Sequence, residues 1–167
     1  DRPEIAAEQL SADAYLEAAQ ANLDVVEGWI TAHPETDFEI FFPPYSILYW
    51  DKTIRLGQTE AVFAAMELAC ERLLAYENVR LYDFLMDPEI VLNLDNYCDH
   101  IHHSGQVCTQ VLDLLAAGEY RLTEENMDTV LAQWRELVVH YDYEKFWDED
   151  FWIAWNEEHG IGEEPAS

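Results

Sequence analysis

The sequence is poor in basic residues and in cysteine, and it has no long apolar run. Eight Lys and Arg stand against 35 Asp and Glu, which gives a formal net charge of −27. This field repels phosphate backbones and anionic lipid head groups, so nucleic acid is not expected as a partner. Solubility is the ordinary role of such acidity, and recognition of cationic surfaces or substrates is the functional alternative.

The few cysteines exclude two common kinds of site. Cys70, Cys98 and Cys108 are odd in number and show no CxxC spacing, so they indicate neither a zinc site nor a complete disulfide framework. Cys70 falls at an apolar helical position and is expected in the core, while pairing of Cys98 with Cys108 stays open.

No segment approaches the roughly 20 apolar residues of a membrane span, and no signal peptide is visible. The chain begins with Asp1 rather than Met, as expected of a processed chain or of one cut from a longer protein.

Length and apolar content indicate a folded domain. The chain has 167 residues, of which 50% are hydrophobic and 13% aromatic. These values are typical of a globular protein and not of a disordered one. We expect one domain over residues 1–141, followed by a tail over residues 142–167.

Periodicity predicts alternating helices and strands. A three-and-four spacing of apolar residues predicts helices over residues 11–32 and 58–76. Aromatic and branched residues predict a strand after each helix, at Phe38–Phe42 and at Val79–Asp83. The α-β-α-β order predicts an α/β fold with a parallel sheet flanked by helices. Two strands are fewer than the about five or six of a typical sheet, so a partner chain or strands preceding the given sequence are expected to complete it.

Two more helices are predicted in the second half of the chain. Ser104 is expected to cap a helix over Gly105–Ala117, which Gly118 ends. Thr123, followed by two acids, is expected to start a longer amphipathic helix that reaches Tyr141.

The tail differs in composition from the domain. Residues 142–167 are strongly acidic and hold three of the six Trp. The ordinary interpretation is a terminal helix whose aromatic side chains pack on the domain. The alternative is a non-enzymatic docking module, since exposed aromatic residues rimmed by charge are typical of interface anchors.

Three histidines and an aspartate lie together at residues 99–104, where a helix is predicted to begin. Asp99 and His102 are three apart, so the carboxylate can accept a hydrogen bond from the imidazole Nδ1–H and leave Nε2 as a general base. The ordinary interpretation is a solvated loop in which Asp99 or Ser104 caps the helix. A third interpretation is a zinc-type metal site built from Asp99, His100, His102 and His103. Neighbouring histidines in a loop point in different directions, so no metal or cofactor is predicted.

A His–Asp pair needs a Ser or Cys to activate, and the sequence shows no candidate in a suitable context. Ser11 and Ser46 lack a GxSxG motif, and Ser104 is too close to His102 in sequence. Ligands of parallel sheets gather at the carboxyl ends of the strands, so the loop that contains Ser46 and the His-rich segment are expected to line one crevice. Tyr45 and Trp50 are candidate binding residues on its wall, with a place in the core as the alternative.

The segment Asp99-His100-Ile101-His102-His103-Ser104 resembles the final Asp-x-x-His block of SGNH/GDSL hydrolases. Residues 41–51, Phe-Phe-Pro-Pro-Tyr-Ser-Ile-Leu-Tyr-Trp-Asp, and more weakly residues 120–126 are similar to bacterial members of DltD type, which transfer acyl groups. The resemblance covers roughly residues 13–140. It implies the C-terminal part of a three-layer, flavodoxin-like SGNH hydrolase fold.

This resemblance also implies a function. His102 would be the general base and Asp99 its orienting carboxylate, in a serine esterase or acyltransferase that acts on O-acyl esters, for instance of cell-envelope glycans. The Ser block of the family has no match here, so the chain is expected to be inactive alone. A preceding segment or a second copy would complete the sheet, and the family suggests an extracytoplasmic or membrane-anchored location.

Overall fold

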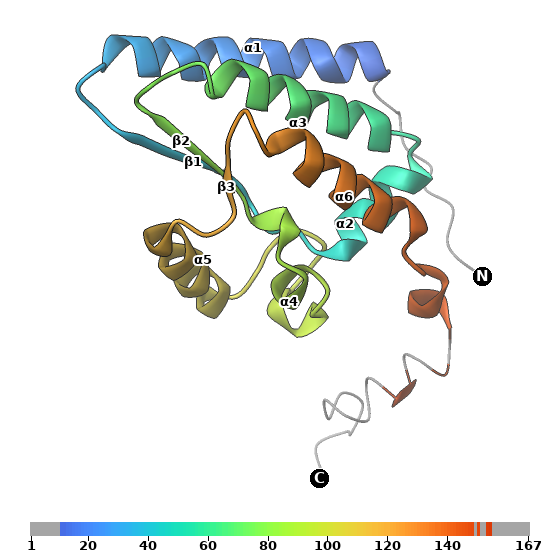
Figure 1. The fold of residues 1–167 in the computed structure, drawn as a ribbon. Coiled ribbons are helices and arrows are strands. Elements are labelled where there is room, and N and C mark those ends of the chain that lie inside the picture. The colour runs from blue at the N-terminus through green and yellow to red at the C-terminus, as the bar shows by residue number, and fades with distance from the viewer. Residues whose placement is uncertain (1–10, 149, 151–152, 155–167) are drawn as a thin grey trace, which may run out of the picture.

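The computed structural model describes residues 11–148, 150 and 153–154, and in these residues helices surround a small mixed sheet (Figure 1). The helices are α1 (Ala12–Ala32), α2 (Ile47–Arg55), α3 (Thr59–Leu73), α4 (Pro88–Val91), α5 (Gly105–Ala117) and α6 (Met127–His140). The strands are β1 (Phe38–Phe42), β2 (Val79–Asp83) and β3 (Arg121–Leu122). The predicted α/β class is confirmed.

The sheet has the strand order β1-β2-β3. β1 and β2 are parallel, as predicted, with Phe42 opposite Asp83 at their carboxyl ends. β3 runs antiparallel to β2, so the expectation of a purely parallel sheet is wrong at this strand. The chain reverses into β3 through Gly118 and Tyr120, whose φ angles of 74° and 58° both lie in the left-handed region.

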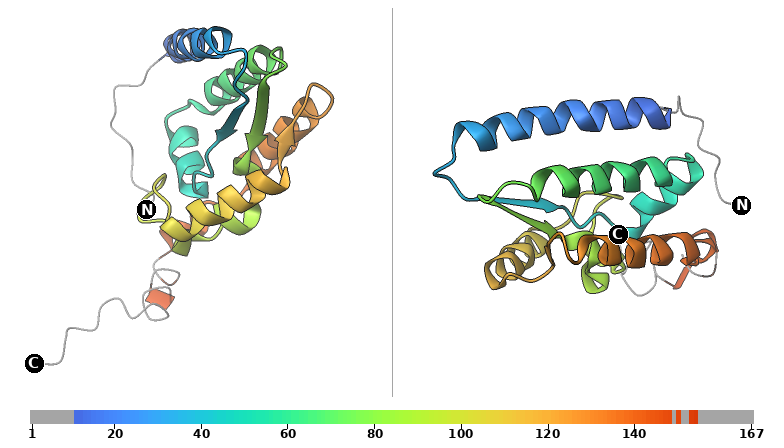
Figure 2. Two further views of the ribbon diagram at one scale, coloured as in Figure 1. Left: turned by 90° about the vertical axis from the view of Figure 1, so that its left-hand side faces the viewer. Right: turned by 45° about the horizontal axis from the view of Figure 1, so that its top comes forward.

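The two faces of the sheet have different cover. Val79 and Leu81 of β2 face the main core, which α1, α3 and α6 also line. Tyr82, the residue between Leu81 and Asp83, points to the opposite face of the sheet and packs against Val107 and Val111 of α5. In both figures α1 runs alongside α3, on the same side of the molecule (Figures 1 and 2).

Helix boundaries follow local caps. Ser104 accepts the Val107 N–H and Gly118 ends α5, which confirms the predicted helix. α6 starts at Met127, four residues after the predicted Thr123. The delay arises because Asn126 Oδ1 accepts the Thr123 N–H at 2.8 Å and so folds the intervening residues into a turn.

The main core is rich in aromatic residues. Trp50 is fully buried, with its ring stacked on Phe63 at 4.9 Å between centroids, and Cys70 is fully buried as expected. At the start of the tail, Tyr143 and Phe146 are buried against the same core. Trp147 is half-buried against the same core, whereas Trp152 and Trp155 lie outside the described residues, so the docking interpretation stays a prediction. No helix in the described part of the chain has the length and apolar character that crossing a bilayer requires.

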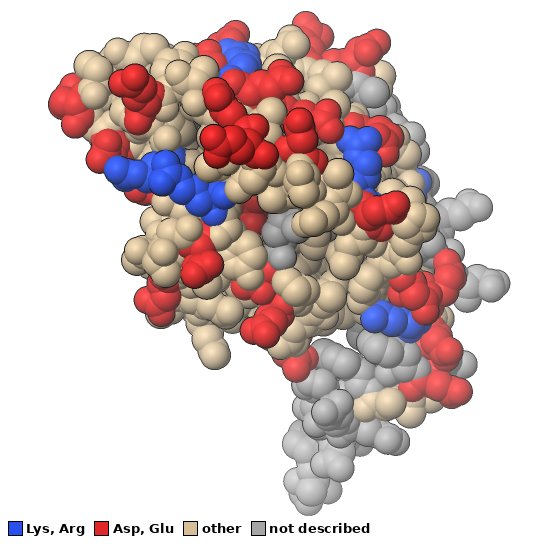
Figure 3. All heavy atoms as spheres, viewed as in Figure 1, with Lys and Arg blue, Asp and Glu red and all other residues tan. Residues whose placement is uncertain are grey.

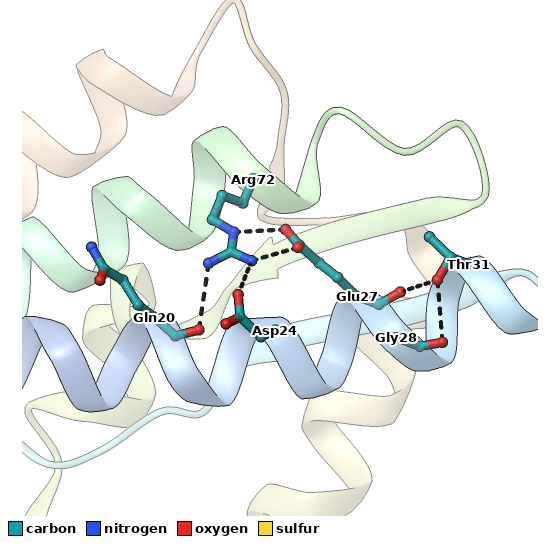
Figure 4. A network of polar contacts seen from close by, with 6 residues as sticks. All are labelled: Gln20, Asp24, Glu27, Gly28, Thr31 and Arg72. Carbon is teal, nitrogen blue, oxygen red and sulfur yellow. Dashed lines mark hydrogen bonds and ion pairs between the residues drawn. The ribbon is translucent and has the colours of Figure 1, made fainter.

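An ion-pair network joins α1 to α3 (Figure 4). Arg72 of α3 binds both carboxylate oxygens of Glu27, with Nε 2.7 Å from Oε1, and its Nη2 lies 2.6 Å from Asp24 Oδ1. Its Nη1 also donates to the Gln20 carbonyl at 3.4 Å. One guanidinium therefore contacts two successive turns of α1.

Glu27→Gln is expected to lower the melting temperature by a few degrees, and Asp24→Asn by less. The Glu27 side chain is 20% exposed and holds Arg72 in a bidentate pair, whereas the Asp24 side chain is 71% exposed and holds one nitrogen. An exposed ion pair with a single contact adds little to the stability of the fold, and a bidentate ion pair adds more. Thermal unfolding followed by circular dichroism measures both variants. Equal shifts would contradict the dominance of the Glu27 pair.

Candidate functional site

The His-rich segment folds as a tight turn that leads into α5. Asp99 Oδ1 accepts the backbone N–H groups of Ile101 at 2.8 Å and of His102 at 2.7 Å. The turn is closed by the Cys98 N–H, which donates to the His102 carbonyl at 2.9 Å. Tyr97 and His103 form a β-bridge at its base. Backbone bonds thus hold the Asp99 carboxylate in one orientation.

The second oxygen of Asp99 holds the ring of His102. His102 Nδ1 lies 2.6 Å from Asp99 Oδ2. The hydrogen bond from the His102 ring, followed by those from the two backbone N–H groups, holds the pKa of Asp99 well below its usual range. An ionised carboxylate only accepts, so Nδ1 is the donor and Nε2 of a neutral ring is left with its lone pair. The predicted Asp99–His102 contact is present.

Two hydrogen bonds connect this turn to the loop after β1. The Ser46 hydroxyl donates to the His100 carbonyl at 2.9 Å, and the Tyr97 hydroxyl donates to the Pro44 carbonyl at 2.6 Å. The loop after β1 and the His-rich turn, which were predicted to follow the carboxyl ends of two strands, are therefore neighbours. Ser46 is fully buried, and this contact engages its hydroxyl away from the His102 ring.

The other two histidines have different neighbours. His100 Nε2 lies 3.3 Å from Lys52 Nζ, and burial, followed by the Lys52 charge, lowers the pKa of His100. His103 Nδ1 lies 3.7 Å from Cys108 Sγ, and both Cys98 and Cys108 are free thiols. Within the described residues, no three His, Cys, Asp or Glu side chains come together as metal ligands. The geometry gives the metal-site interpretation no support.

Tyr45 and Trp50 border one small cavity. Its volume is about 240 Å³, and aromatic and aliphatic residues of α1, α2, α3 and the end of β1 make up its wall. Trp50 contributes from the core and not from an exposed wall, because its side chain is fully buried. Asp99 and His102 are not among the residues that line this cavity. The structure thus brings the two predicted groups to neighbouring loops without placing them around a single pocket.

Ordinary surface pairs offer a comparison for the Asp99–His102 pair. His140 Nε2 lies 3.0 Å from Glu136 Oε2, with both side chains more than 70% exposed. The Asp99–His102 pair is also exposed, at 44% and 69%, but its contact is shorter. Its carboxylate is additionally fixed by backbone donors and its loop is bonded to another loop. This support orients the exposed His102 imidazole in a way that the His140 pair does not show.

The serines of the described residues are all engaged in local structure. Ser11 accepts the Ala14 N–H and caps α1, and Ser104 caps α5. Ser46 holds the His100 carbonyl. None of these three hydroxyls is bonded to His102, so within the described part of the chain the pair has no serine to activate.

A second unusual carboxyl group, that of Asp83 at the end of β2, was not singled out from the sequence. Its side chain is only 1% exposed, and burial raises its pKa to about 7 even though the Leu85 N–H donates to it. The available signal was an acid directly after the apolar run of a strand. Such positions are where open α/β sheets place ligand-binding groups.

The surface around these elements is predominantly acidic. Figure 3 shows Asp and Glu side chains spread over the face in view, with Lys and Arg in small groups. This distribution agrees with the formal charge of −27. It favours approach of neutral or cationic molecules over anionic ones.

No family model, curated protein or solved structure matches this chain.

Proposed function

We propose that this chain supplies the His–Asp part of a serine acyl-transfer site of SGNH hydrolase type, acting on O-acyl esters such as those of cell-envelope glycans. The carrying observation is the 2.6 Å contact between His102 Nδ1 and an Asp99 carboxylate that two backbone N–H groups orient. The bond leaves Nε2 as the base. The resemblance of residues 99–104 to the Asp-x-x-His block supports the same assignment.

In the proposed reaction, His102 accepts and then donates one proton in each of the two half-reactions. Its Nε2 takes the proton of a serine hydroxyl while the serine oxygen bonds to the ester carbonyl carbon. It then gives that proton to the departing alcohol oxygen, which leaves an acyl-serine. The second half repeats these steps with water or an acceptor hydroxyl, and Asp99 stays ionised throughout to stabilise the imidazolium.

We place the serine on strands that extend the sheet beyond β1. The order β1-β2-β3 leaves one side of β1 without a strand among the described residues. In a flavodoxin-like sheet, with strand order 2-1-3-4-5, β1 and β2 would correspond to the last two strands. The missing strands would then pair with the open side of β1. A segment preceding the given sequence is the favoured source of these strands, and a second copy of the chain is the alternative.

Covalent labelling tests this proposal. The natural polypeptide, expressed from its own start codon, is treated with a fluorophosphonate that reacts with activated serines, and the labelled residue is mapped by mass spectrometry. We expect one labelled serine, and we expect His102→Ala to abolish the labelling while His140→Ala preserves it. Absence of labelling in the folded wild-type protein, or labelling that survives His102→Ala, would overturn the proposal.

A further inference from the structure

A cavity of about 400 Å³ opens beside the carboxyl end of β2, at the turn that brings α5 into β3. Its volume lies within the roughly 300–1,000 Å³ that is usual for small-molecule sites. Its lining residues come from β2, the α5–β3 turn and the start of α6, and they are Asp83, Gly118, Tyr120, Arg121, Asn126 and Val130. It shares no lining residue with the cavity that Tyr45 and Trp50 border.

One carboxylate oxygen in this wall has no partner. Asp83 Oδ1 accepts the Leu85 N–H at 3.1 Å, whereas Asp83 Oδ2 is buried without a hydrogen-bond donor from the described residues. Burying a carboxylate oxygen without a donor costs more than a hydrogen bond contributes. A buried carboxylate oxygen of this kind calls for a partner from outside the chain, which can be a water molecule, an ion or a ligand.

Other polar groups of the wall are already engaged. Asn126 Oδ1 accepts the Thr123 N–H at 2.8 Å, and its Nδ2 donates to the Arg121 carbonyl at 2.9 Å. Burial, followed by the Asp87 charge, raises the pKa of the Tyr120 hydroxyl, so this group stays protonated near neutral pH. The unmet requirement of the cavity is therefore a hydrogen-bond donor for Asp83.

Charge selects the kind of donor. Burial, followed by the Asp83 charge, raises the pKa of the Cys70 thiol of α3 to about 12, so this thiol stays neutral near pH 8. Arg121 also borders the cavity, from β3, but its side chain is exposed and solvent screens its charge. The chain as a whole carries a net charge of −27 and attracts cations. A cationic N–H donor both pairs with the carboxylate and offsets its burial.

We propose that this cavity binds a small molecule carrying a protonated primary amine, whose N–H donates to Asp83 Oδ2 while its carbon chain lies along Val130. The site does not depend on His102 and lies outside the acyl-transfer proposal. A quaternary ammonium ion carries the same charge but has no N–H to donate. The site should therefore distinguish the two.

Titration of the full chain with ethylamine near pH 8, at constant ionic strength, tests the proposal through backbone amide chemical shifts. We expect saturable shifts at Leu85 and Tyr120, with tetramethylammonium giving at least about 10-fold weaker binding, which is the effect of losing about 1.4 kcal/mol. Asp83→Asn keeps the shape of the carboxyl and removes its charge, so it should weaken ethylamine binding to the same extent. Val130→Phe, which narrows the cavity from α6 without touching the carboxyl, should also weaken it.

Asp128→Asn is the matched control, because Asp128 is an exposed acid in the first turn of α6. It removes one negative charge near the cavity and should leave ethylamine binding within about twofold of wild type. The proposal is overturned if ethylamine causes no saturable shift. It is equally overturned if tetramethylammonium binds as well as ethylamine, or if Asp83→Asn binds as tightly as Asp128→Asn. Because every arm measures binding, these outcomes are independent of esterase activity.

Discussion

His102→Ala is expected to lower ester turnover by the intact natural polypeptide at least about 10⁴-fold, since loss of a triad histidine costs up to about 10⁶-fold. The physical reason is that the serine hydroxyl then has no nearby base to take its proton. Hydrolysis of a small acetyl ester such as p-nitrophenyl acetate measures the effect. His140→Ala is the matched control, since His140 is also an exposed histidine paired with an acid, at 3.0 Å from Glu136.

Asp99→Asn separates orientation of the ring from folding of the turn. The Asn carbonyl can still accept the Ile101 and His102 N–H groups that Asp99 Oδ1 accepts now. The group facing His102 Nδ1 becomes an amide donor, which favours the wrong tautomer. We expect turnover to fall at least about 100-fold with an unchanged melting curve. Wild-type turnover in either His102→Ala or Asp99→Asn would contradict the assigned roles.

Local chemistry explains which part of the site could be predicted. The contact between Asp99 and His102 spans three residues, and an Asx turn brings them together with few long-range requirements. The contacts that anchor the turn, from Ser46 to His100 and from Tyr97 to Pro44, join residues more than fifty positions apart. Sequence spacing carries no information on such contacts, so the prediction that the loops are neighbours rested on the parallel-sheet rule.

Element length explains which part of the fold could be predicted. α1, α3 and α5 are long enough to show periodicity, and β1 and β2 have dense aromatic and branched content. β3 has two residues, which is too short for any pattern. The helix α2 was not predicted, because its nine residues follow closely on Pro-Pro and include aromatic residues. Ser46 at its N-cap position was a usable signal for a helix start.

The burial of Asp83 could not be predicted, because it depends on how α3 and α6 pack over the sheet. Acidic side chains are mostly exposed in folded proteins, so the sequence alone favours an exposed Asp83. Once the carboxyl is enclosed, it becomes the feature with the largest expected effect on stability.

Asp83→Asn is expected to stabilise the protein, and increasingly so as the pH rises. In the folded chain burial raises the pKa of Asp83 from 3.8 to about 7, so the folded state keeps a proton that the unfolded chain has released. Stability therefore falls as the pH rises from about 4 to about 7 and then levels off. The full cost above pH 7 is about 4 kcal/mol, of which about 2 kcal/mol develops between about pH 5.5 and about pH 8.5.

Urea unfolding at these two pH values measures the effect as a difference between proteins. Other titrating groups are common to wild type and variant, so the self-repulsion of a chain with charge −27 cancels in the difference. The advantage of Asp83→Asn should grow by about 2 kcal/mol from the lower to the higher pH, and Asp128→Asn, which replaces an exposed acid of α6, is the matched control. An advantage that stays constant with pH would mean that Asp83 is ionised at its ordinary pKa in the folded protein. In that case a donor must already hold Oδ2, and the carboxyl would not be available to an amine in the cavity.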